Sequence, residues 1–317
     1  MSWAALLATS CASEVTPETS ESFAASLASA LHAACPPAAP DDGAARERCA
    51  DQLGDLPVLR SHMTSTFRWG GQTEGAGYDP TRSNTTRFNP FVWRRMYLST
   101  FMFDGQHRVE EDGPRSVVHV NIAFRGQLDP GDYPYPFWHA EKKWRSYEAA
   151  RELLFILEEG KVVGVLRSAE QEAERPHVAR TWDQSWSWTS PRGAEPQNAL
   201  YANLLSANNP HRSALEEAYR AFSEAQRQSE CTSCHSPNNT NAQNPLELFN
   251  YPNQALTGRH AIVAELEQNT MPPANTDAGT GVGIGDTPYR QQLLTLARAF
   301  AEAGDRALVF EGEPASL

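Results

Sequence analysis

Two cysteines and a histidine near the C-terminus have the spacing of a covalent haem attachment site. The segment reads Cys231-Thr-Ser-Cys234-His235, which is the pattern of c-type haem attachment. Two thiols add across the haem vinyl groups, and the adjacent histidine reaches the iron on one face. Two intervening residues let one helical turn present both sulfurs and the imidazole to a single macrocycle. The pattern therefore predicts one covalent haem c.

Two other kinds of site use the same cysteine spacing. A bare Cys-x-x-Cys can be a redox disulfide or half of a zinc site. A zinc site would have to recruit His235 and His260 at poor spacing, since no second cysteine pair follows in the chain. A thioredoxin-like motif would follow a strand in a βαβ unit, and this pair does not. Haem attachment remains the preferred interpretation.

A methionine downstream is the candidate for the second axial ligand. Met271-Pro-Pro stands 36 residues after His235. A thioether on a proline-stiffened loop suits electron transfer, because Met/His ligation raises the reduction potential of the iron. Core packing is the common role of a lone methionine. His260, expected near the start of a helix, is the competitor for this position.

Helices are expected on both sides of the motif. Ser213-Ala-Leu-Glu216 has the capping-box pattern, and apolar residues at helical spacing continue from it toward Cys231. Thr287 before Pro288 marks the start of a closing helix over 288–303, which Gly304 can end.

In this order of elements, residues 205–317 resemble a class I c-type cytochrome domain. The resemblance implies an all-α fold and single-electron transfer. It also implies thioethers at Cys231 and Cys234, His235 as the proximal iron ligand and Met271 as the distal one. Two features depart from the family. The interval from His235 to Met271 is short, and the segment contains no lysine.

The charge of this segment restricts its partners. Residues 205–317 contain seven arginines and thirteen acidic residues, a net charge of -6 before any haem propionate. A redox partner protein would therefore need a basic or largely apolar docking face. The whole chain has a formal charge of -12, which argues against nucleic acid as a partner because phosphate contacts need a basic surface.

The first part of the chain predicts a second domain, so the protein is expected to be multidomain. Residues 31–195 are expected to form an α+β domain, an antiparallel sheet with a helix laid on it. The expected strands are 92–103, 116–124 and the hairpin of 152–157 with 161–166, and the helix is 139–150. No motif in this domain assigns a reaction or a ligand.

The compartment is inferred from the remaining cysteines. Residues 1–30 are interpreted as a leader and tether, with a truncated and imperfect lipoprotein signal that would make Cys11 a lipid anchor. Because c-type haem is attached outside the bacterial cytoplasm, a periplasmic or other extracytoplasmic location is expected. With Cys231 and Cys234 holding haem, Cys35 and Cys49 remain as a disulfide pair, which fits an oxidising compartment. Two unpaired buried thiols are the alternative.

Three functions follow from these observations. An electron-transfer protein, or the electron-transfer domain of an oxidoreductase, is the preferred one. A haem-dependent oxidoreductase acting on a small substrate is the first alternative, and a haem-based redox sensor is the second. The sequence contains no motif that establishes an enzyme.

Overall fold

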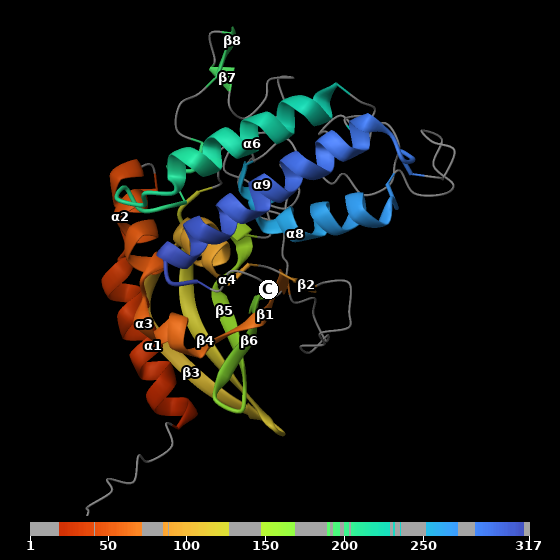
Figure 1. Ribbon diagram of the computed structural model, residues 1–317. Helices are drawn as coiled ribbons and strands as arrows, with labels where there is room; N and C mark the ends of the chain where they lie inside the picture. Colours follow the sequence, from red (N-terminus) through yellow and green to blue (C-terminus); the bar gives the residue numbers. More distant parts are fainter. Residues whose placement is uncertain are drawn as a thin grey trace, which may run out of the picture.

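The computed structural model describes residues 19–40, 42–71, 85–87, 89–126, 147–168, 189–190, 193–196, 200–202, 204–228, 231, 235, 252–271 and 283–313. Within these ranges the chain is α+β, with a sheet flanked by N-terminal helices and a group of long C-terminal helices beside it (Figure 1). Residues 1–18 of the predicted leader and tether, including Cys11, lie outside the described residues. Its last residues, 20–30, belong to the helix α1 (Ser20–Ala34). No helix among the described residues is long and apolar enough to cross a membrane.

The larger sheet is mixed, which corrects the expectation of an antiparallel one. Among the described residues its order is β2-β1-β6-β5-β4-β3. The pair β1 and β6 is parallel, and the other neighbours are antiparallel. The strands are β1 (Met63–Gly71), β2 (Thr85–Arg87), β3 (Phe101–Asp112), β4 (Arg115–Phe124), β5 (Glu152–Glu158) and β6 (Lys161–Arg167), and a separate ladder pairs β7 (Thr189–Ser190) with β8 (Gly193–Pro196).

The predicted hairpin is confirmed as β5 and β6. Glu159 and Gly160 form its turn with φ of 51° and 72°. Positive φ at both central residues is the geometry whose twist matches that of the flanking strands. The strand predicted over 116–124 is also confirmed, as β4. Of the helix predicted over 139–150, only 147–150 is described, and 147–149 is helical.

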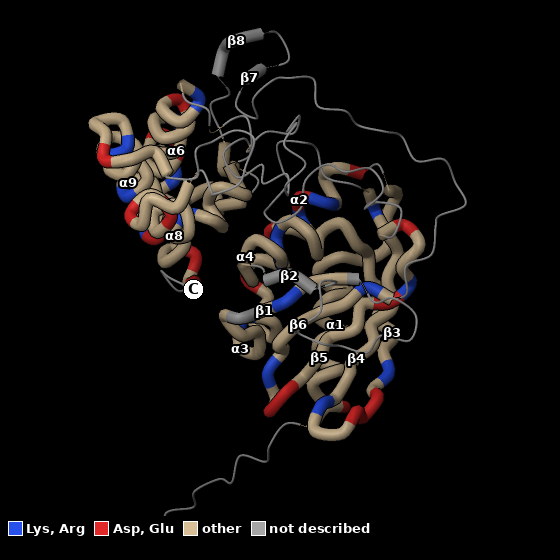
Figure 2. The backbone as a smooth tube through the Cα atoms, turned by 90° about the vertical axis from the view of Figure 1, so that its right-hand side faces the viewer, with Lys and Arg blue, Asp and Glu red and all other residues tan. Residues whose placement is uncertain are grey.

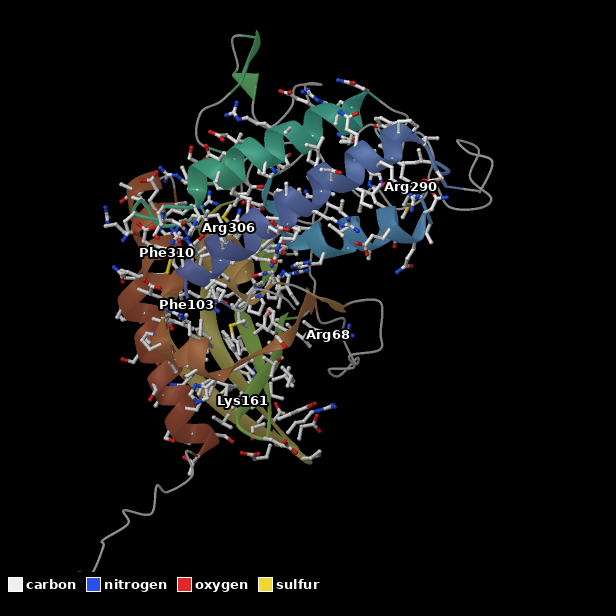
Figure 3. The ribbon with its side chains drawn as sticks, viewed as in Figure 1. Arg68, Phe103, Lys161, Arg290, Arg306 and Phe310 are labelled. Carbon is white, nitrogen blue, oxygen red and sulfur yellow. A yellow bond between two sulfur atoms is a disulfide. The ribbon has the colours of Figure 1, made fainter. Side chains whose placement is uncertain are left out.

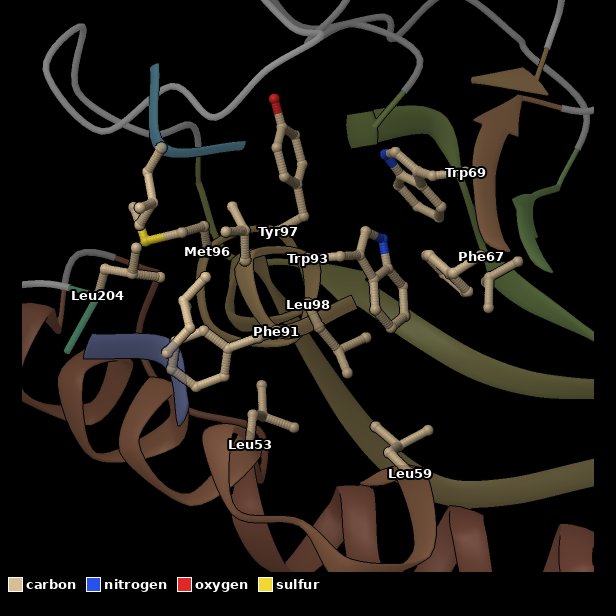
Figure 4. Packing of buried hydrophobic residues seen from close by; sticks show 14 of the residues in the cluster. Leu53, Leu59, Phe67, Trp69, Phe91, Trp93, Met96, Tyr97, Leu98 and Leu204 are labelled. Atoms are coloured by element: carbon tan, nitrogen blue, oxygen red, sulfur yellow. The ribbon is translucent and has the colours of Figure 1, made fainter. Parts of the chain in front are cut away.

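The strand predicted over 92–103 is wrong for most of its length. The chain there forms α4 (Pro90–Val92), a π-helical turn over Trp93–Tyr97 and a 3-10 turn over Leu98–Thr100. The Asn89 side chain starts this helix by accepting hydrogen bonds from the N–H groups of Phe91 and Val92. Aromatic residues favour buried surfaces more than an extended backbone, and here they fill the core from a helix (Figure 4).

Strand β3 begins only at Phe101 and continues past residue 103, the predicted strand end, to Asp112. Its register with β4 shifts between Phe103 and His107, and Gly105 has a φ of 84°. This irregularity has the character of a β-bulge, in which an extra residue is accommodated without ending the strand.

The predicted disulfide between Cys35 and Cys49 is confirmed. It joins the C-terminal end of α1 (Ser20–Ala34) to α2 (Gly43–Gly54), and both cysteines are fully buried. Helix α1 packs against β3 and β4, and α3 (Pro57–His62) contacts β6, while α2 packs against the helical segment 93–100 (Figure 1). The bond therefore fixes two covering helices to each other beside the core.

The C-terminal helices are α6 (Arg212–Arg227), α8 (Pro252–Gln268) and α9 (Pro288–Phe310). Helix α9 packs against α6 through Phe300, whose ring centroid lies 5.6 Å from that of Tyr219 and stacks on Phe222 at 6.1 Å. The predicted start of α9 is confirmed, since the Thr287 side chain accepts a hydrogen bond from the Arg290 N–H.

Two details of these helices differ from the expectation. Gly304 does not end α9 but lies buried within it, where a Cβ would come within 2.7 Å of the Leu256 side chain on α8. The glycine thus allows a close approach of two helices. Ser213 does not cap α6, which begins at Arg212 without a side-chain cap. The Glu216 carboxylate instead accepts a hydrogen bond from the Tyr201 N–H at 3.3 Å.

The boundary predicted near residues 195–205 stays a prediction, although buried apolar contacts continue across it. Leu204 lies near Met96 in the same hydrophobic cluster (Figure 4). At the other end of the helical part, Arg94 forms an ion pair with Glu313, and the Arg60 guanidinium donates to the Gly312 carbonyl at 3.1 Å. The residues before and after the predicted boundary therefore share one hydrophobic core and stabilise each other.

Loss of the disulfide is expected to lower the free energy of unfolding by about 3 kcal/mol, the loop-entropy value for a loop of this length. The double variant Cys35→Ala/Cys49→Ala tests this in urea denaturation. Dithiothreitol should lower the stability of the wild-type protein to that of the variant and leave the variant unchanged. Equal stability of the oxidised wild type and the variant would show that the disulfide does not contribute to the free energy of unfolding.

Candidate haem site

The ends of the predicted haem motif lie on one helical turn. The backbone N–H of His235 donates to the Cys231 carbonyl at 2.9 Å, the i to i-4 bond of an α-helix. Both residues are partly exposed. Helix α6 ends at Arg227, shortly before them. Cys234 lies outside the described residues, so its place on this turn stays a prediction.

Met271 directly follows a defined helix end. Helix α8 ends at Gln268, and Asn269 takes a φ of 54°. The Thr270 N–H then donates to the Glu265 carbonyl at 3.2 Å. This is the hydrogen bond of a Schellman motif, with asparagine in the left-handed position that glycine usually takes. The partly buried Met271 therefore leaves α8 in a fixed direction.

The first turn of α9 holds this helix end in place. The Arg290 guanidinium donates from Nε to the Leu266 carbonyl and from Nη2 to the Glu267 carbonyl, both at 2.8 Å. The Gly285 N–H donates to Asn269 Oδ1 at 3.1 Å. Last-turn carbonyls of a helix lack intrahelical partners and attract cations. Figure 3 shows Arg290 at the end of α9 that adjoins α8.

The last turn of α9 holds the chain that precedes α6. Glu311 Oε1 accepts hydrogen bonds from the Ser206 N–H at 2.9 Å and from the Asn209 side-chain amide at 2.7 Å. The same amide donates to the Ala307 carbonyl at 2.9 Å. Helix α9 thus contacts the entry to α6 with one end and the exit of α8 with the other. These two helices lead to the haem motif and to Met271, respectively.

His260 lies within α8, not at the helix start expected for it. Its Nε2 lies 2.9 Å from Asp305 Oδ1 on α9. The buried Arg259 donates to the same oxygen from Nε at 2.8 Å. The contact gives His260 a role in joining two helices. Axial ligation by His260 remains the untested alternative to Met271.

A polar cluster on the sheet contains a buried histidine. The side chain of His119 is 7% exposed, and its Nδ1 lies 2.7 Å from Arg108 Nη2 and 3.1 Å from Glu152 Oε2. Burial raises the pKa of the Glu152 carboxyl, but hydrogen bonds from Arg108 and His119 outweigh burial, so that the pKa is lowered overall. Both partners lie at Nδ1, and the Nε2 of His119 lies 3.4 Å from Glu110 Oε2.

Comparisons with known proteins do not identify a relative of this chain: no family model, curated protein or solved structure gives a significant match. Within the described residues, no group of three or more His, Cys, Asp or Glu side chains is arranged to hold a metal ion. The assignment of the haem site therefore depends on the motif and its local geometry.

The sequence analysis missed Arg290, Asn269 and Glu311 as residues that support the site. Asn269 has a local signal, because asparagine is favoured in the left-handed position after a helix. Arg290 and Glu311 have none, since their partners are distant in sequence: Leu266 for Arg290 and Ser206 for Glu311.

Replacement of Arg290 by alanine is expected to lower the free energy of unfolding by about 2 kcal/mol, because two carbonyls at the end of α8 lose a charged donor. Arg306→Ala is the matched control, since Arg306 lies on the same helix and forms an exposed pair with Glu302 at 3.9 Å. Its effect should stay below about 0.5 kcal/mol. Urea denaturation measures both. Equal losses would contradict the role of Arg290.

The lowered pKa of Glu152 predicts a defined acid sensitivity. A depressed carboxyl pKa contributes stability above the unfolded value of about 4.3, and this contribution is lost as the pH falls through the folded value. Glu152→Gln should therefore flatten the fall of unfolding free energy between about pH 5 and pH 3. Glu159→Gln, in the exposed turn, is the control. A steep fall that is identical in all three proteins would contradict the prediction.

Proposed function

We propose that residues 205–317 form a monohaem c-type cytochrome domain that transfers single electrons outside the cytoplasm. Cys231 and Cys234 would hold the haem through thioethers, and His235 and Met271 would ligate its iron. The observation that carries this proposal is the hydrogen bond from His235 N–H to Cys231 C=O. It places the two ends of the Cys-x-x-Cys-His segment at the spacing of one helical turn, as attachment to one macrocycle requires.

The residues present fit this group in chemistry and position. A thiolate and an imidazole on one partly exposed turn remain accessible for attachment. The Schellman end of α8 and the Arg290 hydrogen bonds hold the chain that carries Met271. A fixed thioether suits electron transfer, because little has to move when the charge of the site changes. When bound, the haem would supply an iron that is reduced and oxidised by one electron.

The packing of α6 on α9 also supports the proposal. A helix before the haem motif that packs against the closing helix is the arrangement implied by the resemblance to class I cytochromes. Here the contact is made by Tyr219 and Phe222 against Phe300. The all-α fold of the whole segment and its membership of that class remain part of the proposal.

The surface charge indicates the partner. Acidic residues (red) and basic residues (blue) are interspersed along α6, α8 and α9 (Figure 2). Residues 205–317 have a net charge of -6, from seven arginines and thirteen acidic residues. We therefore expect a redox partner protein with a basic or apolar docking face. Binding to a basic partner should weaken as the salt concentration rises.

The confirmed disulfide supports the proposed compartment. Disulfides persist in oxidising environments and are rare in the cytosol, and Cys35 is joined to Cys49. This agrees with a periplasmic or other extracytoplasmic location. A lipid anchor at Cys11 remains part of the same proposal.

Replacement of Met271 by alanine is expected to open the sixth position of the iron. The reduced variant should bind carbon monoxide and have a lower reduction potential, because thioether ligation favours the ferrous state. The wild-type protein should bind no carbon monoxide. Visible spectroscopy and redox titration provide the measurements.

His260→Ala is the control and should leave spectrum and potential unchanged. If His260→Ala opens the iron and Met271→Ala does not, the ligand assignment is wrong. If the wild-type protein itself binds carbon monoxide, a haem-dependent oxidoreductase becomes the better interpretation.

A further inference from the structure

A buried arginine at the end of β4 has two guanidinium nitrogens without a hydrogen-bond partner among the described residues. Arg125 is 3% exposed. Its backbone N–H donates to the Thr100 carbonyl at 2.7 Å, which fixes the position of its main chain. Within the part of the chain that the structure describes, its Nε and Nη1 have no hydrogen-bond partner. Buried charges are otherwise paired, because leaving a charge without a partner away from water is costly.

The charges around Arg125 increase this cost. Burial lowers the pKa of the Arg125 guanidinium, and the nearby Arg46 and Arg48 of α2 lower it further, while Asp42 raises it. The Asp42 carboxylate also caps α2 by accepting a hydrogen bond from the Ala45 N–H at 2.9 Å. Two further guanidinium groups therefore act on Arg125, while the one nearby carboxylate that favours its charge already caps a helix. This local positive excess occurs in a chain with a net charge of -12.

We propose that Arg125 binds a small oxyanion, of the phosphate or carboxylate class, with Arg46 and Arg48 adding attraction. Guanidinium groups match the geometry of both kinds of anion and bind them through charge-assisted hydrogen bonds. The anion would satisfy the donors of Arg125 and neutralise the repulsion among the three arginines.

The site is independent of the proposed haem site. It lies between the end of β4 and the first turns of α2, within residues 31–195, and uses none of the residues assigned to haem. It gives a binding function to the part of the chain for which no motif predicts a ligand. Failure of the haem assignment would leave this proposal intact, and the reverse also holds.

Calorimetric titration of the full-length protein with inorganic phosphate, at low ionic strength, tests the proposal. The wild-type protein should bind one phosphate saturably, and added sodium chloride should weaken the binding. Arg125→Gln should weaken it at least about tenfold. Arg151→Gln is the matched control, because Arg151 is exposed and its guanidinium donates to the Glu148 carbonyl; the affinity of this variant should equal that of the wild type. A titration with acetate in place of phosphate tests whether the site binds carboxylates.

Three outcomes would overturn the proposal. The first is the absence of saturable binding of both phosphate and acetate to the wild type. The second is binding that Arg125→Gln leaves unchanged. If Arg125→Gln does not fold, Arg46→Gln is measured in its place, and an unchanged affinity of that variant is the third. A loss of affinity of about threefold, compared with Arg151→Gln, supports the site, and an unchanged affinity refutes it.

Discussion

The arrangement of the C-terminal helices depends on the hydrogen bonds from Arg290 to the last carbonyls of α8. These bonds join the first turn of α9 to the helix end from which Met271 emerges. At the opposite end of α9, Glu311 binds the chain that leads into α6. One helix therefore fixes the two segments that carry the proposed iron ligands. These contacts add to the packing of Phe300 on α6 and of Gly304 against α8.

Local patterns in the sequence predicted some elements correctly because their causes are local. The β5–β6 hairpin has its turn residues in place, and α9 begins at a threonine followed by a proline. The Cys35–Cys49 disulfide followed from counting the thiols left after haem attachment. The haem motif and the role of Met271 were predicted in the same way, from neighbouring residues, and stay predictions.

Other features depend on contacts between distant residues and were not predictable in this way. The aromatic segment that begins at Trp93 is helical because Asn89 caps it and the core accepts its rings from that direction. Gly304 permits a helix crossing instead of ending a helix. The parallel pairing of β1 with β6 joins strands far apart in the chain. Arg290 and Arg125 likewise gain their importance only from the tertiary structure.

Covalent retention of haem is the most direct test of the proposed function. The protein is produced with export to a periplasm that attaches c-type haem, denatured, and extracted with acidified acetone, which removes haem that is not covalently bound. A pyridine haemochrome spectrum of the remaining protein should show one haem per chain, and Cys231→Ser/Cys234→Ser should retain none. Retention of no haem by the wild-type chain, or of equal haem by the double variant, would contradict the account.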